Sequence, residues 1–140
     1  MRKIPFQLRI NSKTFRSDET GTVTVEFVLW LPILLILISL VADASMIFYG
    51  KAHALRIVQD GNRSYSVGRL SNDTNTERYI RERLLSLSDK AAVETRTNSS
   101  GVITTIAQFP ASDLVAVGLL TQLTGFNVFV QSQHLKEYPG

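Results

Sequence analysis

The stretch ETGTVTVEFVLWLPILLILISLVADAS, residues 19–45, decides the architecture of this 140-residue chain. Glu26 is the only ionisable side chain in residues 22–42. A helix of that length rises about 30 Å, which matches the hydrocarbon thickness of a bilayer. The stretch therefore predicts a transmembrane helix at residues 22–42. Pro32 lies inside it, removes one backbone donor and is expected to kink the helix.

The excess positive charge of the chain lies just before this helix. The formal net charge is +3 at pH 7. Five basic and two acidic residues precede Gly21, whereas ten of each follow from Thr22 onward. Basic flanks mark the cytoplasmic side of membrane helices. We therefore expect a single pass through a bacterial inner membrane, with the N-terminus in the cytoplasm and everything after Asp43 in the periplasm.

The same pattern also fits a secretory signal peptide that is cut after Ala44, with Ala42 and Ala44 as the small residues of the cleavage site. Three features disfavour this alternative. The apolar stretch slightly exceeds the usual signal core, Glu26 lies within it, and the sequence beyond Ala44 remains compatible with a helix. In a further alternative, the helix is a permanent anchor for a periplasmic binding module and is never cut.

The start of the apolar stretch has a recognisable order of residues: Gly21, the four residues TVTV, Glu26, Phe27 and the run WLPILLIL. It resembles the processing site of type IV pilin-like proteins, and in particular the TadE-like pseudopilins of the tight-adherence (Flp) pilus system. The resemblance covers about residues 18–67. It implies cleavage between Gly21 and Thr22 by a prepilin peptidase. It also implies a minor component of pilus assembly that contacts other pilins and the pilus assembly platform.

The position of Glu26 has a physical explanation in such a protein. A carboxylate in a membrane helix costs about 2.5–3.5 kcal/mol at the bilayer centre and less near its surface. Cleavage would create an ammonium at Thr22, one helical turn away. Pairing of this ammonium with Glu26, in the same chain or a neighbour, would set the axial stagger of assembled helices, because a mismatched register leaves both charges unpaired. Alternatively, Glu26 is solvated among the lipid headgroups.

The long helix is expected to continue past the membrane over residues 43–69. Ile47, Ala54, Val58 and Tyr65 recur at helical spacing, and two glycines, Gly50 and Gly61, lie on the same side. Small residues at such spacing permit a second helix to approach closely. This face is either covered by the chain's own domain, which we favour, or forms an oligomer seam. Gly61 or Gly68 is expected to end the helix.

The remainder predicts a small α+β domain whose elements follow in the order short helix, hairpin, short helix, strand. We expect a helix at residues 77–88 capped by Asn75 or Thr76, with its charges on a solvated face. A hairpin turning at residues 98–101 should follow. A short helix at residues 113–123 capped by Ser112 and ended by Gly125, and a final strand from Phe126, complete the domain. The exposed edge of that strand could extend the sheet of another subunit.

The expected organisation is a basic cytoplasmic leader at 1–21, a transmembrane helix at 22–42, a periplasmic helix extension at 43–69 and a small α+β periplasmic domain at 70–140.

Chemical motifs are absent from the sequence. There is no cysteine, and the two histidines, His53 and His134, have no ligand-type residues at metal-binding spacing. No phosphate-binding loop, nucleophile elbow or paired-carboxylate motif occurs. No basic stripe with interleaved aromatic residues occurs either. We therefore expect no catalysis, no metal or other cofactor, no small-molecule substrate and no nucleic acid as a partner.

Overall fold

The computed structural model describes residues 19–137, with side chains at residues 23–122 and 125–137. The first 18 residues of the predicted leader lie outside the described part. By its contacts the chain divides into two units, Met1–Leu37 and Ile38–Gly140. The tertiary structure that positions side chains belongs to the second unit.

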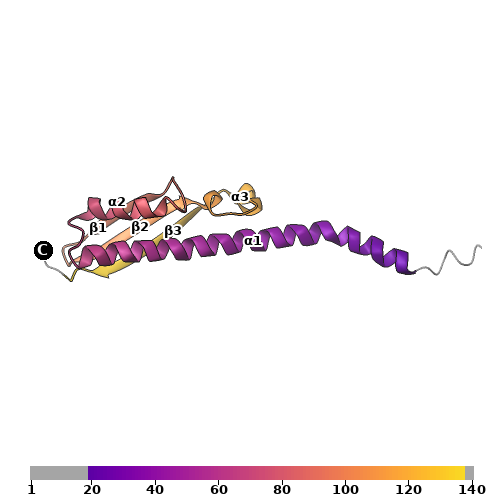
Figure 1. The fold of residues 1–140 in the computed structure, drawn as a ribbon, viewed down its shortest axis with the longest axis horizontal. Coiled ribbons are helices and arrows are strands. Elements are labelled where there is room, and N and C mark those ends of the chain that lie inside the picture. Colours follow the sequence, from indigo (N-terminus) through magenta and orange to yellow (C-terminus); the bar gives the residue numbers. More distant parts are fainter. Residues whose placement is uncertain (1–18, 138–140) are drawn as a thin grey trace, which may run out of the picture. The chain divides into compact units, whose positions relative to one another are not determined.

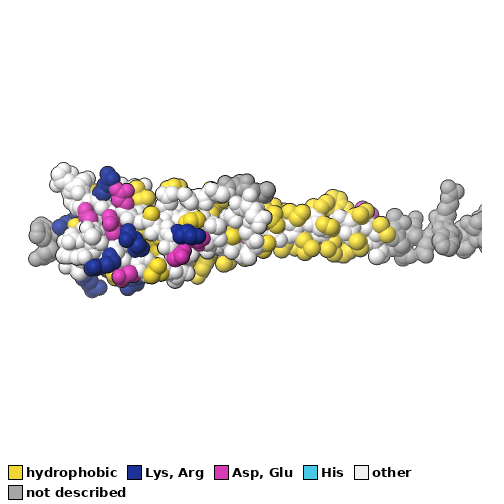
Figure 2. Space-filling model, turned by 90° about the horizontal axis from the view of Figure 1, so that it is seen from above, with side chains coloured by type: hydrophobic (Ala, Val, Ile, Leu, Met, Phe, Trp, Pro, Cys, Tyr) yellow, Lys and Arg dark blue, Asp and Glu magenta, His cyan; other side chains and the backbone are white. Residues whose placement is uncertain are grey.

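The first element is a helix, α1 (Glu19–Ser66), which contains the predicted membrane segment and continues without interruption to Ser66, three residues short of the extension predicted to residue 69 (Figure 1). Among the described residues it is the one helix long and apolar enough to cross a membrane. Its apolar side chains at residues 23–38 are exposed (Figure 2). A helix in the core of a soluble protein would have the same length and composition, but its side chains would be buried. The single long apolar helix is therefore confirmed.

The helix ends before Gly68, one of the two glycines expected to stop it. Gly68 has a φ of 79°, and its N–H donates to the carbonyl of Tyr65 at 3.0 Å. A left-handed glycine just past the last turn is a common helix end. Gly61 lies inside α1 instead.

The three strands form one antiparallel sheet in the order β1-β2-β3. They are β1 (Ala92–Thr97), β2 (Val102–Pro110) and β3 (Asn127–Leu135). The hairpin predicted at residues 98–101 is confirmed between β1 and β2. Asn98 accepts hydrogen bonds from the N–H groups of Ser100 and Val102 through its side-chain Oδ1, and Gly101 takes a φ of 78°.

One face of this sheet is covered by α1 and by α2 (Asp73–Leu84), which run along it in Figure 1. Side chains alternate along each strand, so every second residue points into the core. Val128 and Val130 of β3 are buried, whereas Phe129 between them is exposed. The other face of the sheet, including Ile106, is open.

The predicted apolar face of α1 is confirmed, because Ile47, Ala54, Val58 and Tyr65 are all buried against the chain's own domain. The two glycines mark the closest approaches. A Cβ at Gly61 would lie 2.4 Å from Ile80 Cγ1 of α2. One at Gly50 would lie 2.6 Å from Leu114 Cδ2. The face therefore packs within the molecule and is not an oligomer seam.

The predicted bounds of the second helix are wrong. The sequence indicated residues 77–88, but α2 spans Asp73–Leu84. The reason is the cap: Asn72 accepts a hydrogen bond from the Asn75 N–H at 2.8 Å through Oδ1, so the helix begins one turn earlier than Asn75 or Thr76 would allow. Its charged face is also not wholly solvated, because Glu77 Oε1 accepts a hydrogen bond from the Thr95 N–H at 2.8 Å.

The helix predicted at residues 113–123 is largely wrong. A single 3-10 turn, η2 (Ala111–Asp113), is followed by irregular chain and then by α3 (Leu119–Thr124). Ser112 caps nothing and donates to Asp113 Oδ1 at 3.3 Å. Gly118 breaks the segment with a φ of 84°. The stop at Gly125 is confirmed, since its N–H donates to the Thr121 carbonyl at 2.9 Å.

Candidate processing and assembly site

The residues that the sequence singled out for processing lie in the first turns of α1. Gly21 and Thr22 are helical, and their side-chain surroundings are outside the described part. Thr22 and Glu26 stand four residues apart in one helix and therefore share a face. The carboxylate of Glu26 is exposed and has no ion pair or hydrogen bond within the described part of the chain. A charge with such exposure is accessible to a neighbouring molecule.

The side chains that follow Glu26 form an apolar surface around the whole helix. Phe27 is 60% exposed and Trp30 is 55% exposed, and the segment continues in this way through Ile38. Such a surface needs lipid or other helices around it. Pro32 lies within α1, and the kink expected there stays a prediction.

Asp43, just beyond the apolar run, is a structural residue that the sequence reasoning missed. Its side chain is fully buried. Oδ1 accepts hydrogen bonds from the N–H groups of Val117 and Gly118 at 2.9 and 3.2 Å, and Oδ2 from those of Leu119 and Leu120 at 2.7 and 3.2 Å. One carboxylate of α1 therefore caps α3 across more than 70 residues of sequence.

The hydrogen bonds to Asp43 change its proton affinity. The backbone N–H of Val117, followed by those of Gly118, Leu120 and Leu119, holds the pKa of Asp43 below its ordinary value of 3.8, although burial acts in the opposite direction. The carboxylate is therefore ionised at neutral pH. Gly118, at the N-cap of α3, provides no side-chain acceptor, so the free N–H groups depend on a distant one, and no local sequence pattern marks this pairing.

A second set of buried polar groups joins α1 to the sheet. Thr105 donates to Asn62 Oδ1 at 2.6 Å, and Asn62 Nδ2 donates to the Ser132 carbonyl at 3.1 Å. The Thr105 hydroxyl is also 2.9 Å from that of Thr95. All side-chain polar atoms that are buried in the described part have a hydrogen-bond partner. These contacts fix the register of α1 over β2 and β3.

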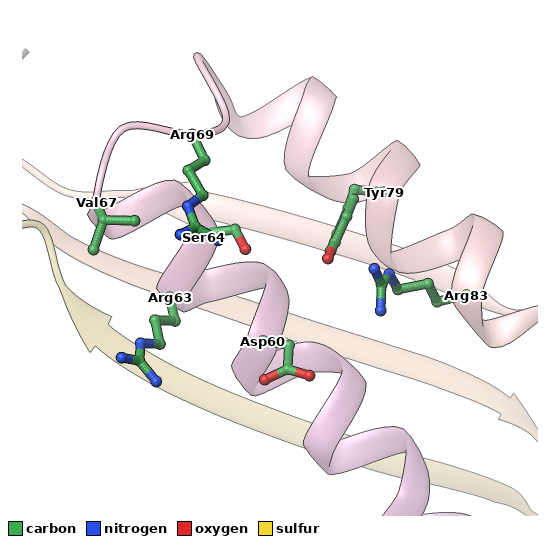
Figure 3. A pocket seen from close by; sticks show the side chains of 7 residues that line it. All are labelled: Asp60, Arg63, Ser64, Val67, Arg69, Tyr79 and Arg83. Atoms are coloured by element: carbon green, nitrogen blue, oxygen red, sulfur yellow. The ribbon is translucent and has the colours of Figure 1, made fainter.

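A polar hollow of about 720 Å³ lies between the end of α1 and α2. Figure 3 shows Arg69 reaching toward Ser64, while Arg63 points away from the other side chains. The Arg83 guanidinium lies 4.4 Å from the ring centroid of Tyr79. Charges of both signs line this exposed hollow, and they are typical of a solvated surface. The full lining is Asp60, Arg63, Ser64, Val67, Arg69, Tyr79 and Arg83.

An apolar hollow of about 400 Å³ lies on another side of the domain, where α1 passes the start of β3. Phe48 of α1 and Phe129 of β3 line it and are 72% and 55% exposed. The remaining lining is Ala44, Ile47, Lys51, Leu120, Phe126, Asn127 and Val128.

Neither histidine belongs to a metal-type cluster in the part of the chain that the structure describes. His53 stacks on Tyr49 with ring centroids 6.2 Å apart, and His134 lies 3.9 Å from a carboxylate oxygen of Glu137.

Comparisons with known proteins concern most of α1. No curated protein and no solved structure matches the chain. The family described as TadE-like protein matches residues 21–63. The match begins at Gly21, includes Glu26 and Phe27, and ends three residues before the end of α1. Residues 21–63 of this chain are similar to the TadE-like protein family.

Proposed function

We propose that the chain is a pseudopilin, or minor pilin, that takes part in assembly of a Tad/Flp-type adherence pilus. It is made as a precursor and cut between Gly21 and Thr22 by a prepilin peptidase. The observation that carries this proposal is the family match, which begins at Gly21, the last residue of the leader. Its partners are the inner membrane, the peptidase, other pilins and the pilus assembly platform.

The placement in the membrane follows from charge and from the surface of α1. The basic leader stays in the cytoplasm, residues 22–42 cross the inner membrane, and the α+β domain lies in the periplasm. The continuous apolar surface of residues 23–38 supports a segment surrounded by lipid in the precursor and by other helices after assembly.

In the mature protein, the new ammonium of Thr22 and the carboxylate of Glu26 form the assembly pair. Both lie on one face of α1, and Glu26 has no other charged partner in the described part of the chain. A carboxylate that pairs across two molecules fixes how far one helix slides past the next, since every other register leaves a charge unpaired in a low dielectric.

The alternative of a secreted domain cut after Ala44 conflicts with the position of Asp43. Such a cut would remove Asp43 from the domain and leave the four N–H groups at residues 117–120 without their acceptor. Buried backbone donors without partners are costly. The uncut periplasmic binding module remains the alternative that the following experiment tests.

The mature N-terminus of the protein purified from its native host separates these functions. Sequencing by Edman degradation or mass spectrometry should find Thr22. Met1 would indicate the uncut anchor, and Ser45 would indicate a secreted domain. Gly21→Leu should leave full-length precursor in the membrane and abolish piliation. Val25→Ala, a substitution beyond the cut, is the control and should be processed normally. Normal processing of the Gly21 variant would contradict the proposal.

A further inference from the structure

The two edges of the sheet differ. At the β1 edge, the outward N–H of Thr95 donates to Glu77 Oε1 of α2 at 2.8 Å, and α2 packs beside this strand. A side chain thus occupies the place that an added strand would need. The β1 edge is covered in the way that natural sheets protect an edge from further pairing.

The β3 edge is not covered in this way. The Val102 carbonyl accepts a hydrogen bond from the Asn98 N–H. Backbone groups alternate in direction along a strand, so the even-numbered residues of β2 turn their N–H and C=O groups toward β1, and the odd-numbered residues of β2 turn theirs toward β3. In the β2–β3 register, these odd-numbered residues of β2 stand opposite even-numbered residues of β3. Phe129, Gln131 and Gln133 therefore point their N–H and C=O groups outward. Within the described part of the chain, nothing hydrogen-bonds to these groups.

The free edge has a defined length. At its far end, Ser66 Oγ donates to the Leu135 carbonyl at 2.7 Å and closes the edge. At its near end, the edge runs into the apolar hollow, because Phe129 belongs to both. An extended segment laid along β3 would thus find three residues of unpaired backbone and then a hollow for one apolar side chain.

We propose that the outer edge of β3 binds one extended segment of a partner protein as an added strand. An apolar side chain of this segment fills the hollow beside Phe48 and Phe129. Main-chain hydrogen bonds give such a complex its affinity, and the pocket gives it its selectivity. The side chains beside the free backbone groups, Gln131 and Gln133, are neutral, and Lys51 is the one charged residue that lines the hollow. The recognised chemistry is therefore a strand without basic side chains that carries an aliphatic or aromatic anchor.

Geometry disfavours two of the ways in which a second copy of this chain could occupy this edge, and parallel pairing of two β3 strands is left to the experiment below. The β1 edge of the second copy is covered, so head-to-tail pairing is blocked. Strand β3 runs in the same direction as α1, because Asn127 shares the hollow with Ala44 while Leu135 meets Ser66. Antiparallel pairing of two β3 strands would set their α1 helices in opposite directions. Copies anchored in one membrane share a direction, and this exclusion rests on the membrane span of the proposed function.

The test uses the full chain in its native host, with the photo-crosslinker benzoylphenylalanine at position 129, 131 or 133. We expect the three positions to cross-link to one linear segment of another protein, in steps of about two residues, because that is the spacing of an added strand. The crosslinker at position 94, on the open face of β1, is the control. Cross-links to a second copy, scattered cross-links, or a yield no higher than at position 94 would overturn the proposal.

A matched pair of variants tests the backbone contact itself. Gln131→Pro removes one outward N–H and leaves the ladder to β2 intact, whereas Gln131→Ala keeps the N–H. The proline should lower the cross-linking yield from position 133 about three- to tenfold, the effect of one net hydrogen bond. The alanine should leave the yield unchanged. Equal yields from both variants would overturn the proposal, provided that circular dichroism shows both folded.

Phe48→Ala, on α1 outside the sheet, gives an independent reading. It should reduce cross-linking from position 129, because the anchor side chain loses one wall of its hollow. An unchanged yield would overturn the role of the hollow. Failure of the proposed function has a different signature: an uncut N-terminus at Met1 would remove the pseudopilin assignment while the stepwise cross-links along β3 persist.

Discussion

At the scale of single residues, two carboxylates of α1 have opposite environments. Glu26 is exposed and has no partner in the described part of the chain, whereas Asp43 is enclosed and accepts four hydrogen bonds. The first is suited to pairing between molecules, and the second holds one molecule together. Substitution of each should therefore affect a different measurement.

Glu26→Ala and Glu26→Gln should leave membrane insertion intact or improve it, since the helix loses a charge that costs about 2.5–3.5 kcal/mol at the bilayer centre. If the proposed function holds, assembly should fail in both, because the ammonium that cleavage creates at Thr22 would lose its partner. Membrane fractionation measures the first effect and counting of surface pili measures the second. Val25→Ala, one residue away, is the control. Wild-type piliation in the glutamine variant would show that the charge is dispensable.

Asp43→Asn should destabilise the domain at neutral pH. Since the folded pKa of Asp43 lies below the ordinary value of 3.8, the ionised carboxylate contributes its full stability above that value. This contribution is lost as the pH falls through the folded pKa. Thermal unfolding of the full chain in non-ionic detergent, followed from about pH 7 to about pH 2.5, should show the wild-type and variant Tm values converging in acid.

The matched control for Asp43 is Asp60→Asn, at an exposed position of the same helix. Its Tm should follow the wild-type value across the whole pH range. Parallel pH curves for wild type and Asp43→Asn, with a constant offset, would contradict the assignment of the acid-dependent stability to Asp43.

At the scale of elements, the contact of α1 with α2 depends on a missing side chain. Gly61→Ala places a Cβ 2.4 Å from Ile80 Cγ1, and Ile80 is fully buried and cannot move away freely. Overpacking of this kind costs about 1–3 kcal/mol, which exceeds the gain in helix propensity of the alanine. Urea unfolding of the full chain measures the loss.

Gln59→Ala, on the exposed side of α1, controls for a general effect of alanine and should change stability by less than about 0.5 kcal/mol. Ile80→Val in the Gly61→Ala background removes part of the clash, so the two substitutions should be non-additive. Strict additivity would show that the two helices do not meet at this point.

The elements also show what the sequence can and cannot predict. The length of α1, its buried face and the hairpin follow from patterns within a few residues of one another. The start of α2 was misplaced by four residues because Asn72 was not recognised as the cap. Most of the helix expected at residues 113–123 was wrong because its N–H groups bind Asp43, more than 70 residues away. Contacts at such separation have no local signal.

The functional residues also divide into those that a local sequence pattern indicates and those that only the folded structure brings together. Gly21, Thr22 and Glu26 stay a prediction from the order of residues, because a glycine before an apolar run with one acid is a local pattern. The trio of Asn62, Thr95 and Thr105 was missed, because three polar residues in separate elements reveal their pairing only when the elements pack. The apolar hollow was missed for the same reason.

At the scale of the whole molecule, the family match and the fold cover different parts. The match ends at residue 63, before α2 and the sheet begin. Expectations for processing and for the membrane segment therefore draw on the similarity to this family. Expectations for the function of the sheet depend on the geometry of the sheet alone. This separation makes the α+β domain the part in which a partner specific to this protein would be recognised.

The unequal edges have a consequence for crowding. If a membrane-anchored protein had two free strand edges, many copies of it could pair edge to edge into continuous intermolecular sheets, as edge strands do in aggregates. Here, Glu77 blocks one side of every copy. The free β3 edge of one copy therefore finds no free β1 edge on the next copy, and the sheet cannot extend from molecule to molecule. High local density can then be tolerated without runaway polymerisation.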